Sequence, residues 1–135
     1  MLDSQFVIAI HDEILAETGG LPGLAGGGVG AVEAALFRIE MHAHYAGLDD
    51  VFGIAGLYAE AVARGHVFND ANKRTALTCA LTYLYRQDIP IPRVAELEEV
   101  VVLLAAGEIS GAAFADFLSA VWLAHGKPTV NAELA

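Results

Sequence analysis

The hydrophobic residues of this chain recur every three to four positions in six separate segments, the spacing that places them on one face of a helix. In the first segment, Phe6, Ile10 and Ile14 repeat at intervals of four, and Asp3 or Ser4 is placed to cap the start. No segment alternates strictly between apolar and polar residues, as a strand would, and no internal repeat is visible. The pattern predicts an all-α bundle of about six helices, over residues 4–18, 31–45, 50–64, 75–86, 94–107 and from 110 onward.

The predicted fourth helix is apolar on nearly every side, because Leu77 and Leu81 mark one face while Cys79 and Tyr83 mark the other. A helix of this kind belongs in the centre of a bundle, where neighbours cover all of its faces. Cys79 is the only cysteine, so the chain has no internal disulfide, and we expect a packed thiol rather than a nucleophile. In the sixth segment, four residues are expected to face inward: Phe114, Phe117, Leu118 and Val121.

Residues 19–30 hold seven of the fourteen glycines, together with Pro22, and must form a loop. Glycine-rich loops can cradle phosphates, but this one lacks both the G-x-G-x-x-G pattern and the Gly-Lys-Ser/Thr ending of a Walker loop. We therefore interpret it as a connection with special backbone angles rather than as a nucleotide-binding loop.

The chain of 135 residues suits one domain, expected over residues 1–125, with a flexible tail over 126–135. Seven Lys and Arg against seventeen Asp and Glu give a net charge of −10, which disfavours a nucleic-acid partner. Charges and glycines interrupt every apolar run before it could span a bilayer, and the N-terminus lacks the basic start of a secretory signal. We expect a cytoplasmic protein with no membrane partner.

A polar stretch over residues 66–74 comes directly before the predicted central helix. Of the seven Lys and Arg residues, Arg64, Lys73 and Arg74 fall within eleven positions, so an acidic protein has gathered positive charge at one place. The start of a helix presents unpaired N–H groups and a partial positive charge, which favours an anion such as phosphate.

The side chains of this stretch suit phosphoryl or nucleotidyl transfer. His66 can act as a base near neutral pH, and Asp70 is a hard anionic ligand for Mg²⁺ held on a nucleotide. Asn72 can orient either a phosphate or the loop, the two cations after it can neutralise phosphate charge, and Phe68 is expected to anchor the loop in the core. An alternative stays open at this point: His66 and Asp70 pair with each other and cap the helix, while the cations are solvated.

Two other groups of polar residues are given a simpler interpretation. His11 and its neighbours Asp12 and Glu13 are expected on the solvated face of the first helix. His42 and His44 are two residues apart, whereas helical metal ligands lie three or four apart, so no zinc site is expected there.

The nine residues His66–Arg74 match every fixed position of the pattern H-x-F-x-D-A-N-K-R and resemble the signature of the Doc (death on curing) toxins, a branch of the Fic superfamily. Residues 10–12, 19–23, 32–36 and 106–110 also resemble Doc segments, so most of residues 5–124 is covered. The compact all-α fold of the family agrees with the helices predicted above.

The resemblance also indicates which reaction to expect. Typical Fic enzymes carry H-x-F-x-D/E-G-N-G-R-x-x-R and transfer AMP from ATP, whereas this chain has Lys73 at the second glycine and Leu77 at the second arginine. Both differences are those of the Doc branch, in which ATP lies reversed and the γ-phosphate is transferred. The resemblance thus implies a kinase that uses ATP and Mg²⁺ to phosphorylate a threonine of elongation factor Tu, which blocks translation and arrests growth.

Carried over from the family, His66 would be the base, and Asp70 would hold magnesium and help position the attacking hydroxyl. Asn72, Lys73 and Arg74 would hold the phosphates, and Arg64 could add to that site. The inhibitory helix signature of Fic proteins is absent from the sequence, so a Phd-like antitoxin is expected to restrain the toxin by folding its C-terminal segment into a groove. AMP transfer and a non-catalytic regulator that binds an antitoxin are the alternatives.

Overall fold

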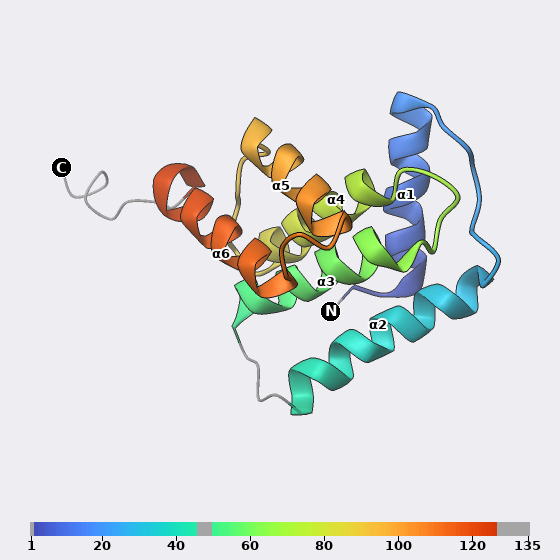
Figure 1. Ribbon diagram of the computed structural model, residues 1–135, viewed down its shortest axis with the longest axis horizontal. Helices are drawn as coiled ribbons and strands as arrows, with labels where there is room; N and C mark the ends of the chain where they lie inside the picture. Colours follow the sequence, from blue (N-terminus) through green and yellow to red (C-terminus); the bar gives the residue numbers. More distant parts are fainter. Residues whose placement is uncertain (1, 46–49, 127–135) are drawn as a thin grey trace.

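The computed structural model describes residues 2–45 and 50–126, and within them the fold is all-α, as predicted (Figure 1). A single isolated bridge between Leu24 and Phe68 is the one β-type pairing in the described part of the chain. The expected tail lies outside the described residues, apart from Gly126. The elements are α1 (Ser4–Thr18), α2 (Gly28–Tyr45), α3 (Val51–Gly65), α4 (Asn72–Arg86), α5 (Ala95–Ala105), α6 (Gly111–Val121) and the π-helical turn η1 (Trp122–Gly126).

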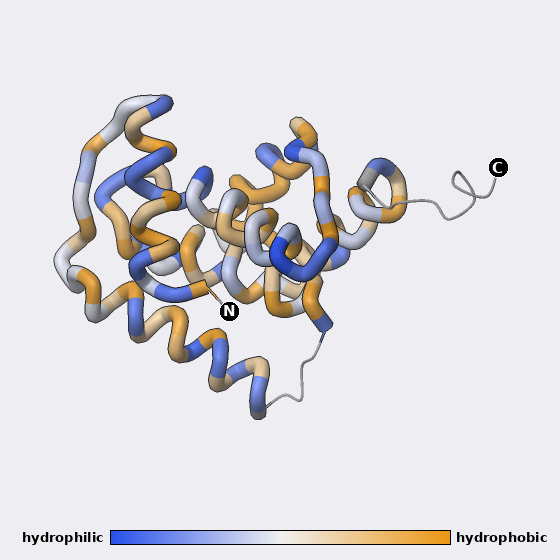
Figure 2. The backbone as a smooth tube through the Cα atoms, turned by 180° about the vertical axis from the view of Figure 1, so that it is seen from behind, coloured by the Kyte–Doolittle hydropathy of each residue, from blue (hydrophilic) through white to orange (hydrophobic). Residues whose placement is uncertain are grey.

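Helix α4 occupies the centre, as its apolar circumference predicts. It packs against α3, α1 and α5, while α6 and α2 pack on α3. In Figure 1, α1 lies on one side of α3 and α4, and α5 and α6 lie on the other side. Figure 2 shows that hydrophobic stretches run along the helices in the middle of the molecule. The α4 residues Ala76, Leu77, Ala80 and Leu84 have no exposed surface, so their burial supplies much of the apolar contact that stabilises the bundle.

Side-chain caps begin three of the helices, and the one at α1 was expected. The Asp3 carboxylate accepts a hydrogen bond from the Phe6 N–H at 2.8 Å, and Asp50 accepts one from the Phe52 N–H at 3.0 Å. The Ser110 hydroxyl accepts from the Ala113 N–H at 3.0 Å. These bonds satisfy N–H groups that a helix start leaves unpaired, and so they fix where the helices begin.

Two helices begin three residues earlier than their hydrophobic patterns indicate. Helix α2 starts at Gly28 rather than residue 31, and α4 starts at Asn72 rather than residue 75. Neither start is marked by a hydrophobic pattern, because glycine disfavours helix and the first turn of α4 is polar. Helix α5 ends at Ala105 rather than 107, since Gly107 takes a left-handed φ of 80°.

The sixth helix corrects one expectation about the core. Phe114 and Leu118 are fully buried, whereas Phe117 is 44% exposed. Helix α6 approaches α3 closely at Gly111, where a Cβ atom would lie 3.0 Å from the Gly56 carbonyl oxygen. This contact sets the buried face along Gly111, Phe114, Ala115 and Leu118, and Phe117 points away from it. None of the helices in the described ranges is both long enough and apolar enough to cross a bilayer.

Candidate functional site

The loop between α3 and α4 is bounded by two residues in the left-handed backbone region. His66 has φ 49° and ψ 39° where α3 ends, and Ala71 has φ 62° and ψ 25° where α4 begins. This conformation is unfavourable for residues that carry a Cβ atom and persists only where surrounding contacts hold it. The loop conformation must therefore be enforced by its neighbours.

Part of this support comes from Asn72, the first residue of α4. Its side-chain oxygen accepts a hydrogen bond from the Phe68 N–H at 3.2 Å, and its amide nitrogen donates to the Phe68 carbonyl at 3.0 Å. Of the two roles that its chemistry allows, orientation of the loop is thus the one seen. The Phe68 side chain is 3% exposed and packs in the core, so it anchors the loop there.

The glycine-rich segment supports the loop from the other side. Ala25 donates its N–H to the Val67 carbonyl at 2.9 Å, and the Asn69 N–H donates to the Gly23 carbonyl at 3.1 Å. Gly20 passes so close to Asp70 that a Cβ atom there would lie 2.7 Å from the carboxylate oxygen Oδ2. The expectation of a connection with special backbone angles is confirmed, because Gly19, Gly20, Gly23 and Gly28 all have positive φ. Its second role, as a brace for the motif loop, was not anticipated.

Asp70 is held as an ionised carboxylate. Oδ1 accepts from the Ala71 N–H at 2.8 Å and Oδ2 accepts from the Leu21 N–H at 3.2 Å. The Ala71 bond, then the Leu21 bond, with smaller contributions from Arg74 and His11, holds the pKa of Asp70 below its usual range. A half-buried, oriented carboxylate of this kind suits a hard cation. Within the described residues no three His, Cys, Asp or Glu side chains form a metal-binding group. A cation at Asp70 would therefore take its other ligands from a molecule bound in the same place.

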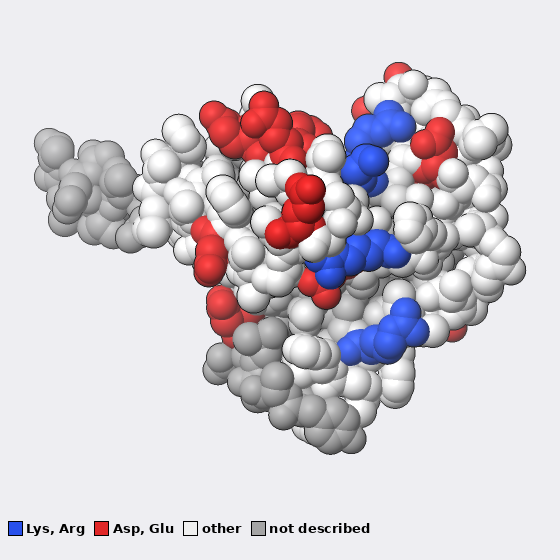
Figure 3. Space-filling model, in the orientation of Figure 1, with Lys and Arg blue, Asp and Glu red and all other residues white. Residues whose placement is uncertain are grey.

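The polar residues of the motif line one cleft with a volume of about 430 Å³, a size suited to a small-molecule ligand. Figure 3 shows Lys and Arg side chains gathered on this face, while Asp and Glu side chains gather over α5. The wall opposite the motif is apolar and comes from α5 and its end, with Val102, Ala105 and Ala106. The motif residues in the cleft are His66, Asn69, Asp70, Ala71, Asn72, Lys73 and Arg74.

His66 is exposed at the cleft and forms no hydrogen bond with the described part of the chain. The alternative in which it pairs with Asp70 is not seen, because backbone N–H groups of Ala71 and Leu21 hold that carboxylate instead. The imidazole is therefore available to accept a proton from a group that enters the cleft.

Positive charge converges on the N-terminus of α4, since Lys73 and Arg74 lie in its first turn and line the cleft. Lys73 is exposed, and one guanidinium nitrogen of Arg74 donates to the Thr18 hydroxyl at the end of α1. A helix start leaves several N–H groups without a partner inside the helix. Together these groups form an arrangement that suits a phosphate.

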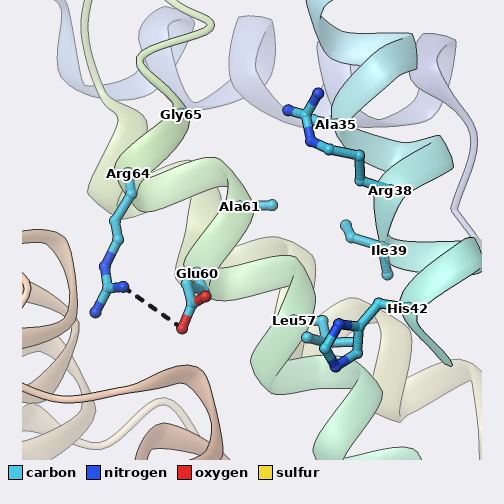
Figure 4. A pocket seen from close by; sticks show the side chains of 9 residues that line it. All are labelled: Ala35, Arg38, Ile39, His42, Leu57, Glu60, Ala61, Arg64 and Gly65. Carbon is cyan, nitrogen blue, oxygen red and sulfur yellow. Dashed lines mark ion pairs between the residues drawn. The ribbon is translucent and has the colours of Figure 1, made fainter. Parts of the chain in front are cut away.

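Arg64 does not join this cleft. Its Nε donates to the Leu104 carbonyl at 2.8 Å, a second guanidinium nitrogen donates to the Ile109 carbonyl, and a third lies 3.6 Å from the Glu60 carboxylate. Arg64 lines a separate cavity of about 300 Å³ between α2 and α3 (Figure 4). The Leu104 carbonyl in the last turn of α5 and the Ile109 carbonyl in the turn that follows bind this side chain, so it ties α3 to the end of α5 rather than reaching the cleft.

His11 is the residue of the site that the sequence interpretation missed. The expectation of a solvated side chain is wrong, because His11 is 1% exposed. Its ring stacks on Phe68 with centroids 3.8 Å apart and an interplanar angle of 7°, and its Nε2 lies 2.9 Å from the Asp70 carbonyl oxygen. One signal was available: His11 follows Val7 by four residues, and Val7 is fully buried, so both lie on the same face of α1.

Cys79, in contrast, has no connection with the cleft. Its side chain is fully buried, and burial raises the pKa of the thiol to about 12. This agrees with the expected packed thiol, since a nucleophilic cysteine needs a lowered pKa and access to solvent.

The comparisons with known proteins agree with this all-α fold. A family model described as the Fic/DOC family matches residues 1–84, well over half of the chain, and this range contains the whole motif. The chain therefore belongs to the Fic/Doc family, as the resemblance indicated. It is similar to a protein named "Protein kinase doc" from Escherichia phage P1, with 42% identity over 112 residues that cover 83% of this chain and 87% of that protein.

Proposed function

We propose that this protein is the toxin of a toxin–antitoxin module and transfers the γ-phosphate of ATP to a threonine hydroxyl of elongation factor Tu. The observation that carries the proposal is the convergence of His66, Asp70, Lys73 and Arg74 on one cleft at the start of α4. The name of the phage relative, a protein kinase, supports phosphate rather than AMP as the transferred group. Translation takes place in the cytoplasm, so the proposal also requires that location.

In this mechanism His66 accepts the proton of the attacking threonine hydroxyl as its oxygen forms a bond to the γ-phosphorus. The bond from that phosphorus to the β-phosphate oxygen breaks, and ADP leaves. His66 suits this role because its ring is exposed at the cleft and makes no hydrogen bond with the described residues.

Asp70 would hold Mg²⁺ that arrives with the nucleotide, and this ion would neutralise charge on the phosphates. The carboxylate fits because it is ionised and because two N–H groups orient it. Lys73, the free nitrogens of Arg74 and the N–H groups at the start of α4 would hold the phosphates. Asn72 would act through the loop, and Arg64 is left out of the phosphate site because its guanidinium is bound elsewhere.

We propose that a Phd-like antitoxin binds and inhibits this protein, as the resemblance to the Doc toxins implies. The antitoxin would fold a C-terminal segment onto the bundle and keep the toxin inactive. Co-expression tests this part: a Phd-like protein should restore growth to cells that produce this chain, and it should copurify with the chain.

The proposed activity is tested by growth arrest together with the mass of the target. Production of the protein should stop growth, and elongation factor Tu from those cells should gain the mass of one phosphate. A folded His66→Tyr variant should leave both growth and mass unchanged. If elongation factor Tu gains the mass of AMP, the assignment moves to AMP transfer. A folded His66→Tyr variant that arrests growth fully would refute the role of His66.

A further inference from the structure

We infer that His11 is a positioning residue for Asp70: it fixes the Asp70–Ala71 peptide group, and through it the Asp70 carboxylate that the proposed reaction uses. The kinetic part of this inference rests on the proposed function, whereas the structural part does not. His11 does not line the cleft and belongs to α1, fifty-nine positions before Asp70 in the sequence. It acts through the loop and is not itself a catalytic residue.

The hydrogen bond between His11 and Asp70 has a defined direction. The Asp70 carbonyl can only accept, so Nε2 of His11 carries the proton and donates it over 2.9 Å. The other ring nitrogen, Nδ1, faces the Asp12 carboxylate at 3.4 Å, so both nitrogens face oxygen acceptors. Because His11 is 1% exposed, water has little access to replace this bond when the donor is removed.

The second contact of His11 is with Phe68, the residue that anchors the loop in the core. Its ring lies almost parallel to the Phe68 ring, 3.8 Å away, and Phe68 is itself buried. The imidazole thus contacts the loop at two points, two residues apart. A side chain that only filled space would provide the ring contact alone, whereas the bond to Asp70 also fixes the orientation of a peptide plane.

Three elements converge on Asp70 as a result. His11 of α1 holds its carbonyl, Leu21 of the glycine-rich segment holds Oδ2, and Ala71 at the start of α4 holds Oδ1. Ala71 follows directly in a left-handed conformation that is unfavourable without such support. Loss of the His11 bond should therefore let the Asp70–Ala71 peptide group rotate, which loosens the bond from the Ala71 N–H to the carboxylate.

Two substitutions separate the two contacts. His11→Phe keeps an aromatic ring of similar size on Phe68 and removes the donor. His11→Gln removes the aromatic ring and retains a side-chain N–H that can donate to the Asp70 carbonyl. His42→Phe makes the same change at an exposed histidine of α2, away from the loop, and serves as the matched control.

Amide hydrogen exchange of the intact protein measures loop geometry without any assumption about activity. In His11→Phe, exchange of the Ala71 N–H should become at least about tenfold faster, while that of the Phe114 N–H in α6 stays unchanged. His11→Gln and His42→Phe should both exchange like the wild type at Ala71. Unchanged exchange at Ala71 in His11→Phe would overturn the inference. If His11→Phe does not fold, fast exchange at Ala71 in a folded His11→Gln variant would overturn it, and wild-type exchange would support it.

Kinetics then test the consequence for the reaction. His11→Phe should lower kcat roughly 10- to 100-fold, because a displaced catalytic group costs rate more than binding. Its KM for the protein target should change less than about threefold, and more Mg²⁺ should be needed for half the maximal rate. His11→Gln should recover most of kcat. A wild-type protein without any transfer would speak against the proposed function, while the exchange measurement would still decide the role of His11.

Discussion

The glycine-rich segment provides a sharp test of how the Asp70 carboxylate is held, because three of its glycines differ in what a methyl group would meet. At Gly20, φ is +131° and an added Cβ atom would lie 2.7 Å from Oδ2 of Asp70 and 3.0 Å from Leu15. At Gly19, φ is +75° but the space around a Cβ atom is open. At Gly26 the space is also open and φ lies outside the left-handed region. Alanine at the three positions thus separates backbone strain from contact with the carboxylate.

The expected magnitudes follow from these surroundings. Gly26→Ala should stabilise the protein by about 0.4–1 kcal/mol, since alanine restricts the unfolded chain. Gly19→Ala and Gly20→Ala should each lower the free energy of unfolding by about 1–3 kcal/mol, the cost of a side chain in a backbone region suited to glycine. Only Gly20→Ala should also displace Asp70, and we expect its rate of phosphate transfer to fall at least about tenfold.

Urea unfolding followed by circular dichroism measures the stabilities, and phosphate transfer to elongation factor Tu measures the rates. Gly19→Ala should stay within about threefold of the wild-type rate at temperatures where it is folded, although it is destabilised. Equal rates for Gly19→Ala and Gly20→Ala, both folded, would show that the close approach of Gly20 to Asp70 has no effect on the reaction.

Three further predictions concern stability and reactivity. The pKa of Asp70 is lower in the folded protein than its unfolded value of 3.8, so the ionised carboxylate stabilises the fold at pH values above 3.8. This stabilisation is lost as the pH falls through the lower folded pKa. In urea unfolding, Asp70→Asn should therefore be less stable than the wild type at neutral pH, and the difference should shrink in acid. Phe114→Ala should cost about 3–5 kcal/mol in the same assay, whereas Phe117→Ala, at an exposed position of the same helix, should stay within about 0.5 kcal/mol; similar losses would contradict the packing of α6. Cys79 should resist a thiol reagent in the native protein and react fully in urea, and rapid native labelling would show that the thiol is accessible.

Much of the helical architecture was predictable because burial leaves a periodic trace in the sequence. The all-round apolar character of Leu77, Cys79 and Tyr83 indicated a central helix, and all three are buried. The start of α4 lies three residues before its hydrophobic pattern, because Ala71 precedes the helix in a left-handed conformation and the first turn is polar.

The site was predictable where chemistry and spacing were local. His66, Asp70, Lys73 and Arg74 lie within nine residues, and the structure places all of them at one cleft. Contacts between distant segments left no such trace. The bond from His11 to Asp70 spans fifty-nine positions, and that from Arg64 to Leu104 spans forty, so their roles emerged only once the helices were packed together.

The central claim, that the cleft transfers the γ-phosphate of ATP, is tested most directly with labelled nucleotide. The purified protein would be incubated with purified elongation factor Tu, magnesium and ATP labelled at the γ-phosphate, beside a sample labelled at the α-phosphate. We expect the γ label alone on elongation factor Tu, and neither label from folded His66→Tyr. Transfer of the α label would contradict γ-phosphate transfer and assign AMP transfer to this cleft instead.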